Sequence, residues 1–391
     1  MKIFIKYIVK QIFHFLLHFF YIFPVKNNRI IFESFNGKQI SDNPFYIWKF
    51  LKEKNIQLDF IWVVGKDTFL SDDLKSKTVV FHSLKYILAM MTSKIIVNNT
   101  GFSTYIPFRK KQILINTWHG GGAYKRVGCE NVAEKKALYF SILKKDVFNI
   151  AKATSVFISS SKKFTDVMTE SNFIPREKYF EVGMPRNDIF FNSIEVQKEN
   201  DKVRSKLELK KDDFVILYAP TYRGAVSSPQ EDSNNIDILK LKSISENKFG
   251  KKAVVLFRGH YSLAYRLDFS LFDKNVSSYP NMQELLCMAD MLITDYSSSM
   301  WDFSFTNKPG FLFVPDLEKY QNERGFYTPI ETWPFAFAKT NEELAEQIMK
   351  WTPEFQAEKN KKHHELLGSF EDGHATERIC EVIENELIND F

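Results

Sequence analysis

The feature that most constrains the fold of this chain is the repeated alternation of short, wholly apolar runs with segments of helical spacing. Segments such as SDNPFYIWKFLKEKN and NMQELLCMAD place apolar residues three or four positions apart, which is typical of helices. Strands that are apolar throughout and separated by helices indicate parallel sheets covered on both faces. The predicted strands are RIIFES, LDFIWVV, KTVVFH, KIIVNNT, QILINT, SVFISS, YFEVG, FVILYAPT, KAVVLFR, NVSSY, MLITDY and GFLFV.

The length of 391 residues favours two domains over one core. A boundary is predicted near GMPRNDIFFNS, where turn-forming Gly183, Pro185 and Asn187 follow a strand. We therefore predict an α/β fold with two doubly wound, Rossmann-like domains that face each other across a cleft. The first covers residues 28–185 and the second residues 186–391, including the helical and acidic C-terminal stretch, while residues 1–27 form a separate helix.

Polar clusters directly follow four of the predicted strands. In open parallel sheets, ligands bind beyond the carboxyl ends of the strands, so these clusters indicate one site better than four unrelated turns. The clusters are Trp118-His119-Gly120-Gly121-Gly122, Thr221-Tyr222-Arg223-Gly224, Arg258-Gly259-His260 and Asp295-Tyr296-Ser297-Ser298-Ser299.

The serine cluster predicts an anion site at the start of a helix. Ser299 and Asp302 have the spacing of a short-armed capping box. The free N–H groups of a first helical turn bind anions, and the hydroxyls of Ser297 and Ser298 add uncharged donors. A serine-rich cap without a ligand is the alternative. Arginines 258 and 223 on neighbouring strand ends favour phosphate.

Two histidines of these clusters are candidate catalytic groups. Three glycines follow His119 and let backbone approach a ligand, and an imidazole there can accept a proton near neutral pH. The alternative is a histidine held by hydrogen bonds inside a turn. His260 can stabilise charge on a transferring phosphoryl group. His363 and His364 lie in a Lys/Glu-rich helix and are predicted to be solvated.

Six stretches of the chain resemble the CDP-glycerol glycerophosphotransferase family, the teichoic acid primases and polymerases with a GT-B fold. They occur in family order and cover roughly residues 30 to 330. The chain departs from the family pattern at Gly121-Gly122, where a Thr-Pro-like pair is expected, and this affects the shape of the acceptor loop. The stretches are ESFNGKQISDNP, NTWHGGG, GMPRND, LYAPTYR, RGH and ADMLITDYSSSMWDFSFTNKPGFLFVPDLEKYQNERGFY.

The resemblance implies that an acceptor hydroxyl attacks the phosphorus next to glycerol in CDP-glycerol and releases CMP. By this resemblance His119 is the base, and the donor diphosphate is bound by His260, Ser297 and Ser298. The first domain is then the acceptor side and the second binds the nucleotide donor. The remaining site candidates, added from their positions, are Thr221, Arg223, Arg258, Asp295, Ser299, Gly120, Arg186 and Asp188.

The expected activity needs no cofactor, because phosphoryl transfer depends mainly on positioning and charge stabilisation. The sequence contains no convincing metal-binding cluster, although magnesium from solution can assist. Two other interpretations stay open: a GT-B sugar-nucleotide glycosyltransferase of cell-surface polysaccharide synthesis, and a non-catalytic membrane-bound partner of a polymer-synthesis complex. Also open are the alditol (glycerol or ribitol), the polymer (teichoic acid or capsule) and the number of units added.

The N-terminus and the charge distribution predict contact with an anionic membrane. Residues 1–185 hold 28 Lys and Arg against 14 Asp and Glu, whereas the remainder holds 25 against 34. No nucleic-acid-binding motif accompanies this basic half. The apolar run after Lys10 is shorter than the roughly 20 residues of a membrane span, and no signal-peptide cleavage site follows it.

We therefore predict an amphipathic helix over residues 1–27 that lies in the membrane interface, with Lys2, Lys6 and Lys10 toward lipid phosphates. The protein would then be peripheral at the cytoplasmic face of the cell membrane, with a lipid-linked acceptor. Three widely spaced cysteines fit a reducing compartment. A helix packed on the protein's own core is the alternative.

Overall fold

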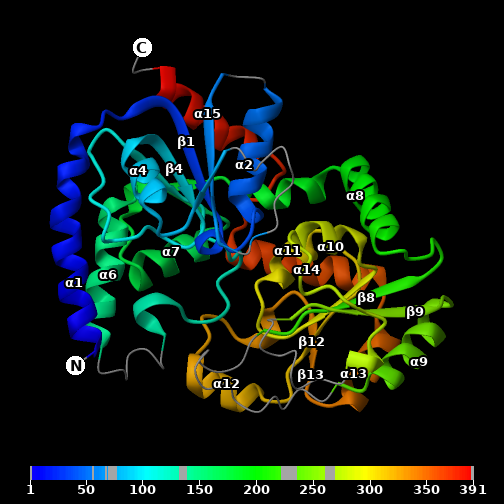
Figure 1. Cartoon of the computed structure of the whole chain (residues 1–391). Coiled ribbons are helices and arrows are strands. Elements are labelled where there is room, and N and C mark those ends of the chain that lie inside the picture. Colours follow the sequence, from blue (N-terminus) through cyan, green and yellow to red (C-terminus); the bar gives the residue numbers. More distant parts are fainter. Residues whose placement is uncertain are drawn as a thin grey trace. The chain divides into compact units, whose positions relative to one another are not determined.

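The computed structural model describes residues 2–54, 57–66, 68, 77–131, 139–221, 236–259 and 269–388. The chain divides into two compact units (Figure 1). Unit 1 comprises Met1–His119, Val127–Asp188 and Phe370–Phe391, and unit 2 comprises Gly120–Arg126 and Ile189–Ser369. The boundary predicted after residue 185 lies close to Asp188, where unit 1 gives way to unit 2. Each unit also contains a segment that was predicted to belong to the other: Phe370–Phe391 lies in unit 1 and Gly120–Arg126 in unit 2.

Unit 1 is built on a seven-stranded sheet in the order β3-β2-β1-β4-β5-β6-β7, in which every pair is parallel. The strand order reverses between β1 and β4, the topological switch point at which doubly wound sheets bind ligands. The strands are β1 Lys26–Glu33, β2 Asp59–Val64, β3 Thr78–Val80, β4 Ser93–Asn98, β5 Ile113–Asn116, β6 Val156–Ser159 and β7 Tyr179–Glu181.

Both faces of the unit 1 sheet are covered, as its apolar strands require. On one face, Ile31 and Ile96 pack with Met90 of helix α4. On the other face, Trp62 lies edge-on to Trp48 of helix α2, with ring centroids 6.0 Å apart. The helices and 3-10 turns are α1 Lys2–Leu17, η1 His18–Ile22, η2 Phe35–Gly37, α2 Asp42–Glu53, α4 Leu84–Thr92, η3 Gly128–Glu130, α6 Phe140–Ala153, α7 Lys162–Ser171, η4 Arg176–Lys178, η5 Pro185–Phe191 and α15 Ala375–Ile388.

The C-terminal segment of the chain completes unit 1. Helix α15 packs against α2, at the opposite end of the sequence (Figure 1). The Asp188 carboxylate accepts hydrogen bonds from the backbone N–H groups of Ala375 at 3.1 Å and Thr376 at 2.7 Å. Glu371 accepts one from the N–H of Met184 at 2.9 Å. The GMPRND turn therefore anchors the returning C-terminus.

Unit 2 has a six-stranded parallel sheet in the order β10-β9-β8-β11-β12-β13, with its switch point between β8 and β11. The predicted fold of two doubly wound parallel sheets is confirmed; β13 was not predicted. The elements are α8 Ser193–Lys206, β8 Phe214–Tyr218, α9 Ile238–Phe249, β9 Ala253–Phe257, η7 Phe269–Leu271, β10 Lys274–Asn275, α10 Met282–Met288, β11 Met291–Thr294, α11 Ser299–Ser304, β12 Gly310–Phe313, α12 Leu317–Arg324, η8 Ile330–Thr332, β13 Ala336–Ala338, α13 Asn341–Lys350 and α14 Pro353–Leu367.

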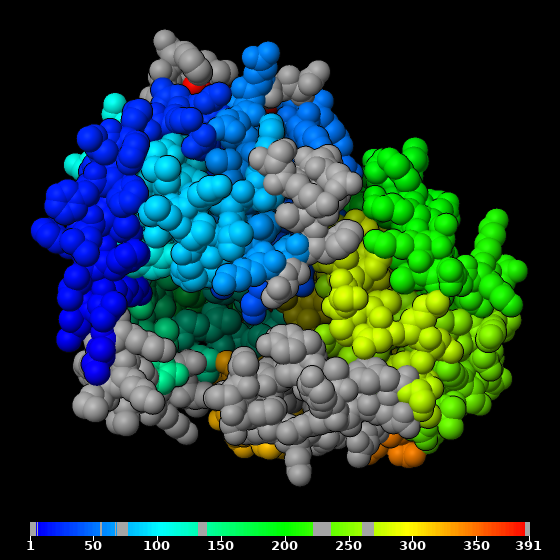
Figure 2. Space-filling view, viewed as in Figure 1, coloured from blue at the N-terminus to red at the C-terminus, as the bar shows by residue number. Residues whose placement is uncertain are grey.

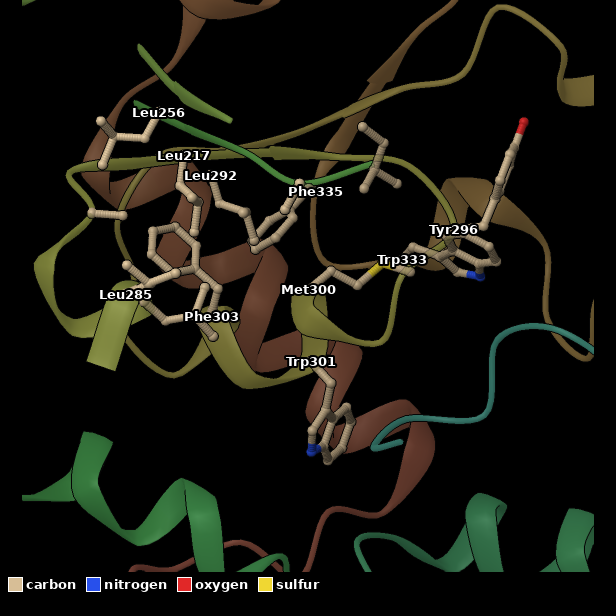
Figure 3. Packing of buried hydrophobic residues seen from close by; sticks show 14 of the residues in the cluster. Leu217, Leu256, Leu285, Leu292, Tyr296, Met300, Trp301, Phe303, Trp333 and Phe335 are labelled. Atoms are coloured by element: carbon tan, nitrogen blue, oxygen red, sulfur yellow. The ribbon is translucent and has the colours of Figure 1, made fainter. Parts of the chain in front are cut away.

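The core on one face of the unit 2 sheet includes the fully buried aromatic residues Trp301, Phe303 and Trp333. Phe303 packs beside Leu285, Leu217 and Leu292 (Figure 3). Trp301 points the other way, toward the loop drawn in teal in Figure 3. It is nevertheless fully buried.

The histidines of α14 belong to this core, so the prediction that they are solvated is wrong. His363 is 2% exposed and lies between the hydroxyl of Tyr124 at 2.9 Å and the carbonyl oxygen of Thr332 at 2.7 Å. His364 contacts the hydroxyl of Ser304 at 2.8 Å. Burial lowers the pKa of His363 to about 4 and the pKa of His364 to about 3, so both rings are neutral at pH 7. The Glu residues of the helix and Lys361 and Lys362 are exposed, whereas Lys359 is half-buried.

Helix α1 lies along unit 1, with Lys10 and His14 half-buried and Gln11 exposed. The side chains of Lys2 and Lys6, also predicted to face lipid phosphates, lie outside the described part of the chain. Lys10 forms an ion pair with Asp146 of α6 at 2.7 Å, so the prediction that Lys10 faces lipid phosphates is wrong. The outward face of α1 is apolar, with Phe15 71% exposed, and the adjoining turn η1 carries Phe19, which is 75% exposed. Figure 2 shows α1 in dark blue along the edge of unit 1. No helix in the described part of the chain has the length and apolarity to cross a membrane.

Candidate functional site

His119 follows β5 at the carboxyl edge of the unit 1 sheet. Its Nδ1 lies 2.7 Å from the backbone carbonyl oxygen of Asn99, which follows β4. A carbonyl oxygen can only accept, so Nδ1 carries the hydrogen of this bond. In the neutral ring the lone pair is then on Nε2, the form that accepts a proton.

Aromatic rings fix the plane of this imidazole. Trp118 stacks on His119 with centroids 4.8 Å apart, and Phe35, which follows β1, meets it edge-on at 5.7 Å. The backbone N–H of Phe35 donates to the side chain of Asn99 at 2.9 Å. The ends of β1, β4 and β5 therefore come together at the unit 1 switch point, around His119.

A buried polar group supports the backbone just before His119. The amide of Asn43 donates to the carbonyl oxygens of Trp118 at 3.1 Å and Thr117 at 3.3 Å, and it accepts from the N–H of Arg186 at 3.1 Å. Arg186 is 2% exposed and pairs with Asp42 at 3.0 Å. The structure thus places Arg186 beneath the histidine loop. Sequence reasoning missed Asn43, although SDNP was part of the recognised stretches.

Thr221 and Asp295 meet at the switch point of unit 2. Thr221 follows β8 and Asp295 follows β11. The Asp295 carboxylate accepts hydrogen bonds from the Thr221 N–H at 2.9 Å, from the Thr221 hydroxyl at 2.8 Å and from the N–H of Tyr296 at 2.5 Å. Asp295 therefore ties the ends of two adjacent strands.

The serines link β11 to α11 in a way that differs from the prediction. The Ser297 hydroxyl accepts from the N–H of Ser299 at 3.2 Å, whereas Asp302 accepts from Gln283 at 3.0 Å. The predicted capping box between Ser299 and Asp302 is therefore wrong, because Gln283 engages the short acidic side chain. Ser298, the N-cap residue, makes no side-chain capping bond and is half-buried.

Arg258 follows β9, the strand next to β8. Its guanidinium donates to the carbonyl oxygens of Tyr279 at 2.5 Å and Val276 at 3.4 Å. Burial lowers the pKa of Arg258 to about 10, and the group stays charged at pH 7. The predicted site residues His260 and Arg223 lie outside the described residues.

The loop after His119 belongs to unit 2 from Gly120 onward. A Cβ on Gly121 would lie 2.1 Å from Trp301, and one on Gly122 would lie 2.4 Å from the ring of Tyr124. Gly122 also has φ +81°, which proline cannot adopt. A Thr-Pro pair would therefore not fit this loop, which explains the departure noted in the sequence.

The groups suited to anions are hydroxyls, backbone N–H groups and one guanidinium, contributed by Ser297, Ser298 and Arg258. Within the described ranges, no three His, Cys, Asp or Glu side chains are placed to hold a metal ion. The arrangement in each unit is suited to proton transfer at His119 and to phosphate binding at the serines.

Comparison with known proteins gives one consistent family. The sequence profile of CDP-Glycerol:Poly(glycerophosphate) glycerophosphotransferase matches residues 15–385. The chain is 30% identical to the teichoic acid poly(glycerol phosphate) polymerase of Bacillus spizizenii, over 95% of this chain and 94% of that protein. It is 30% identical to the teichoic acid glycerol-phosphate transferase of Staphylococcus aureus, over 91% and 92%. The chain spans only about half of the polymerase of Staphylococcus epidermidis, which is 29% identical over 93% of this chain.

Solved structures agree with this result. The wall teichoic acid polymerase TagF superposes with a TM-score of 0.83 at 27% identity, covering 99% of this chain and 96% of that one. A TagF variant with CDPG gives 0.84 at 28%, with the same coverage. The UDP-GlcNAc 2-epimerase of Methanocaldococcus jannaschii, at 13% identity and a TM-score of 0.51, shares the fold alone.

Proposed function

The chain belongs to the CDP-glycerol:poly(glycerophosphate) glycerophosphotransferase family, and on that basis we propose that it transfers glycerol phosphate, or a related alditol phosphate, from a CDP-alditol to an acceptor hydroxyl. The product would be a teichoic acid or capsule polymer. The observation that carries the proposal is the hydrogen bond from His119 to the carbonyl of Asn99, because it directs the proton-accepting nitrogen away from the backbone.

In the proposed reaction, the acceptor oxygen bonds to the phosphorus next to the alditol. Its proton passes to Nε2 of His119, the bond from that phosphorus to the bridging oxygen breaks, and CMP leaves with the electron pair. Ser297, Ser298 and Arg258 would hold the diphosphate. His260 and Arg223 remain proposed diphosphate ligands.

The test is the identity of the released nucleotide. The full chain is incubated with a lipid-linked saccharide acceptor and CDP-glycerol, CDP-ribitol or UDP-sugars in separate reactions. CMP is expected from one of the CDP-alditols, and product length would separate the addition of one unit from the addition of many. Release of UDP would instead support the glycosyltransferase alternative, and release of neither would contradict both.

Ser298→Ala is expected to weaken donor binding by roughly tenfold or more, because a hydrogen bond to a charged group is worth about 1.5–3 kcal/mol. Ser298 is more informative than Ser297, whose hydroxyl also caps Ser299. Calorimetry with CDP-glycerol measures the change. The control is Ser205→Ala on the exposed surface of α8. Equal affinities for the two variants would leave Ser298 as a helix-start residue only.

We further propose that the protein is peripheral on the membrane that carries its acceptor, and that the outward face of α1 and η1 contacts the lipid. The side chains of Phe15 and Phe19 are exposed to solvent, although burying an apolar side chain of this size would contribute about 1.5–3 kcal/mol of free energy. A contiguous exposed apolar face on a helix is typical of contact with a membrane interface.

The double variant Phe15→Ser/Phe19→Ser tests this face without deleting the helix. Sedimentation with phosphatidylglycerol vesicles is expected to show at least tenfold weaker binding, since two large apolar contacts are lost. The matched control is Phe355→Ser/Leu366→Ser on α14, where the side chains are 54% and 60% exposed. Vesicle binding that is unchanged in the α1 variant would refute membrane contact through α1.

A further inference from the structure

Unit 1 contains a cavity of about 780 Å³ between α1, η1, α6 and the segment that precedes β5. This volume lies within the roughly 300–1,000 Å³ of small-molecule sites. Four of its lining residues come from α1 and η1, so the cavity opens beside the helix whose outer face is apolar. The four are Gln11, His14, His18 and Tyr21.

The cavity lies at the edge of the sheet opposite to His119. Its lining residues Gln112, Ser155 and Lys178 directly precede β5, β6 and β7. In a parallel sheet the strands all begin at one edge and end at the other, and His119 follows the end of β5. A ligand in this cavity is therefore separate from the proposed reaction.

The lining is strongly basic: among the described residues it contains five Lys or Arg and no Asp or Glu. None of the five pairs with a carboxylate among the described residues. Asp146, on α6, is already engaged by Lys10 at 2.7 Å and by Thr104 at 3.2 Å. The five basic residues are Arg109, Lys110, Lys145, Lys152 and Lys178.

Two buried nitrogen atoms of the lining have no hydrogen-bond partner in the described structure, Nδ1 of His14 and Nε of Arg109. The guanidinium of Arg109 is nevertheless held in place: it donates to the carbonyl oxygen of Phe20 at 3.0 Å and lies 4.6 Å from the ring centroid of Tyr21. A fixed guanidinium in the lining supplies a positive charge suited to the oxygens of a phosphate.

We propose that this cavity binds the phosphate head group of an anionic phospholipid. The basic lining supplies the counter-charge, and Tyr21, Ile106 and Phe108 supply apolar surface for the glycerol and the first methylenes. Helix α1 and turn η1 both line the cavity and carry the exposed apolar residues, so a lipid bound there can keep its acyl chains in the bilayer. Only the choice of a lipid as the source of the phosphate rests on the proposed membrane contact. The bound lipid would anchor the protein and would not be its acceptor.

The experiment uses a soluble ligand, so that it does not depend on membrane binding. Calorimetry measures binding of a short-chain phosphatidylglycerol, below its micelle concentration, to the full chain and to the triple variant Lys110→Gln/Lys145→Gln/Lys152→Gln. All three lysines are exposed, so the fold should be retained. The control, Lys85→Gln/Lys162→Gln/Lys211→Gln, removes the same charge from exposed positions outside the cavity.

Saturable binding to the unmodified chain is expected, weakened at least tenfold by the cavity variant, since each lysine near an anionic lipid is worth about fivefold. The control should change affinity less than twofold, and short-chain phosphatidylcholine should bind at least tenfold more weakly. Equal affinity for inorganic phosphate or glycerol 3-phosphate would make this a site for soluble phosphate and overturn the lipid proposal. Absence of saturable binding, or equal loss in both variants, would also overturn it.

A parallel assay separates this proposal from the proposed function. The cavity variant is expected to release CMP from CDP-glycerol at the normal rate with a soluble acceptor analogue, because the cavity is remote from His119. Loss of lipid binding with normal CMP release would concern the cavity alone. Normal lipid binding by a chain that releases no CMP would contradict the proposed function and leave the cavity proposal standing.

Discussion

Replacing His119 with alanine is expected to lower turnover of CDP-glycerol by roughly 100-fold or more, the usual contribution of a general base, while donor affinity changes little. In the proposed reaction the base acts on the acceptor hydroxyl, so the affinity for the donor in the ground state should hardly depend on it. Single-turnover release of CMP measures the first quantity, and calorimetry with CDP-glycerol measures the second.

Two further variants test whether the loss of turnover is specific to the His119 side chain. His374→Ala removes an exposed histidine of unit 1 that contacts Glu377 and should leave turnover unchanged. Asn43→Ala should lower turnover less than His119→Ala, because it only loosens the backbone at Trp118 that positions the ring. Near-normal turnover of His119→Ala would remove this histidine from the proposed mechanism.

The second large effect is expected at the contact between Gly121 and Trp301. Trp301→Ala should destabilise unit 2 by about 3–5 kcal/mol, because it empties a fully buried indole site. Gly121→Ala should destabilise it by about 1–3 kcal/mol or more, since the new methyl would overlap Trp301. Together the substitutions should cost less than the sum of the two, because the vacated indole space accepts the methyl.

Urea unfolding followed by circular dichroism gives the four free energies of this cycle. The control for glycine itself is Gly250→Ala, where φ is +66° but a Cβ would meet no atom within 4 Å. That variant should show only the backbone cost of about 1 kcal/mol, with no coupling to Trp301. Full additivity of Gly121→Ala and Trp301→Ala would show that the predicted overlap is relieved elsewhere.

The sheets could be predicted because most strands are short apolar runs separated by segments of helical spacing, a pattern typical of covered parallel sheets. Residues at the carboxyl ends of parallel strands were expected to gather in one site. Thr221 and Asp295 do lie together, since β8 and β11 are neighbours at the switch point. Strand β13, Ala336–Ala338, was missed because three residues carry too little periodicity. The return of α15 to unit 1 was missed because an amphipathic pattern shows that a face is buried and not what buries it.

The predictions that failed at the site also failed because contacts between distant segments decide the structure there. The spacing of Ser299 and Asp302 fits a capping box locally, but Gln283 from another helix engages the acid. The support of the histidine loop joins Asn43 to Arg186, which are far apart in the sequence. Short-range patterns cannot specify such contacts, since they arise only when distant segments pack.

The division of unit 1 by the whole of Ile189–Ser369 bears on how the protein is synthesised. Translation at about 5–20 residues per second leaves roughly 10–40 s between the emergence of Asp188 and that of its partners Ala375 and Thr376. Throughout that interval the surface of α2 that α15 will cover is open to water. Unit 2 can close its core while unit 1 is still waiting for its last helix. A chaperone that shields nascent chains would therefore act on the half of the protein that is made first and finished last.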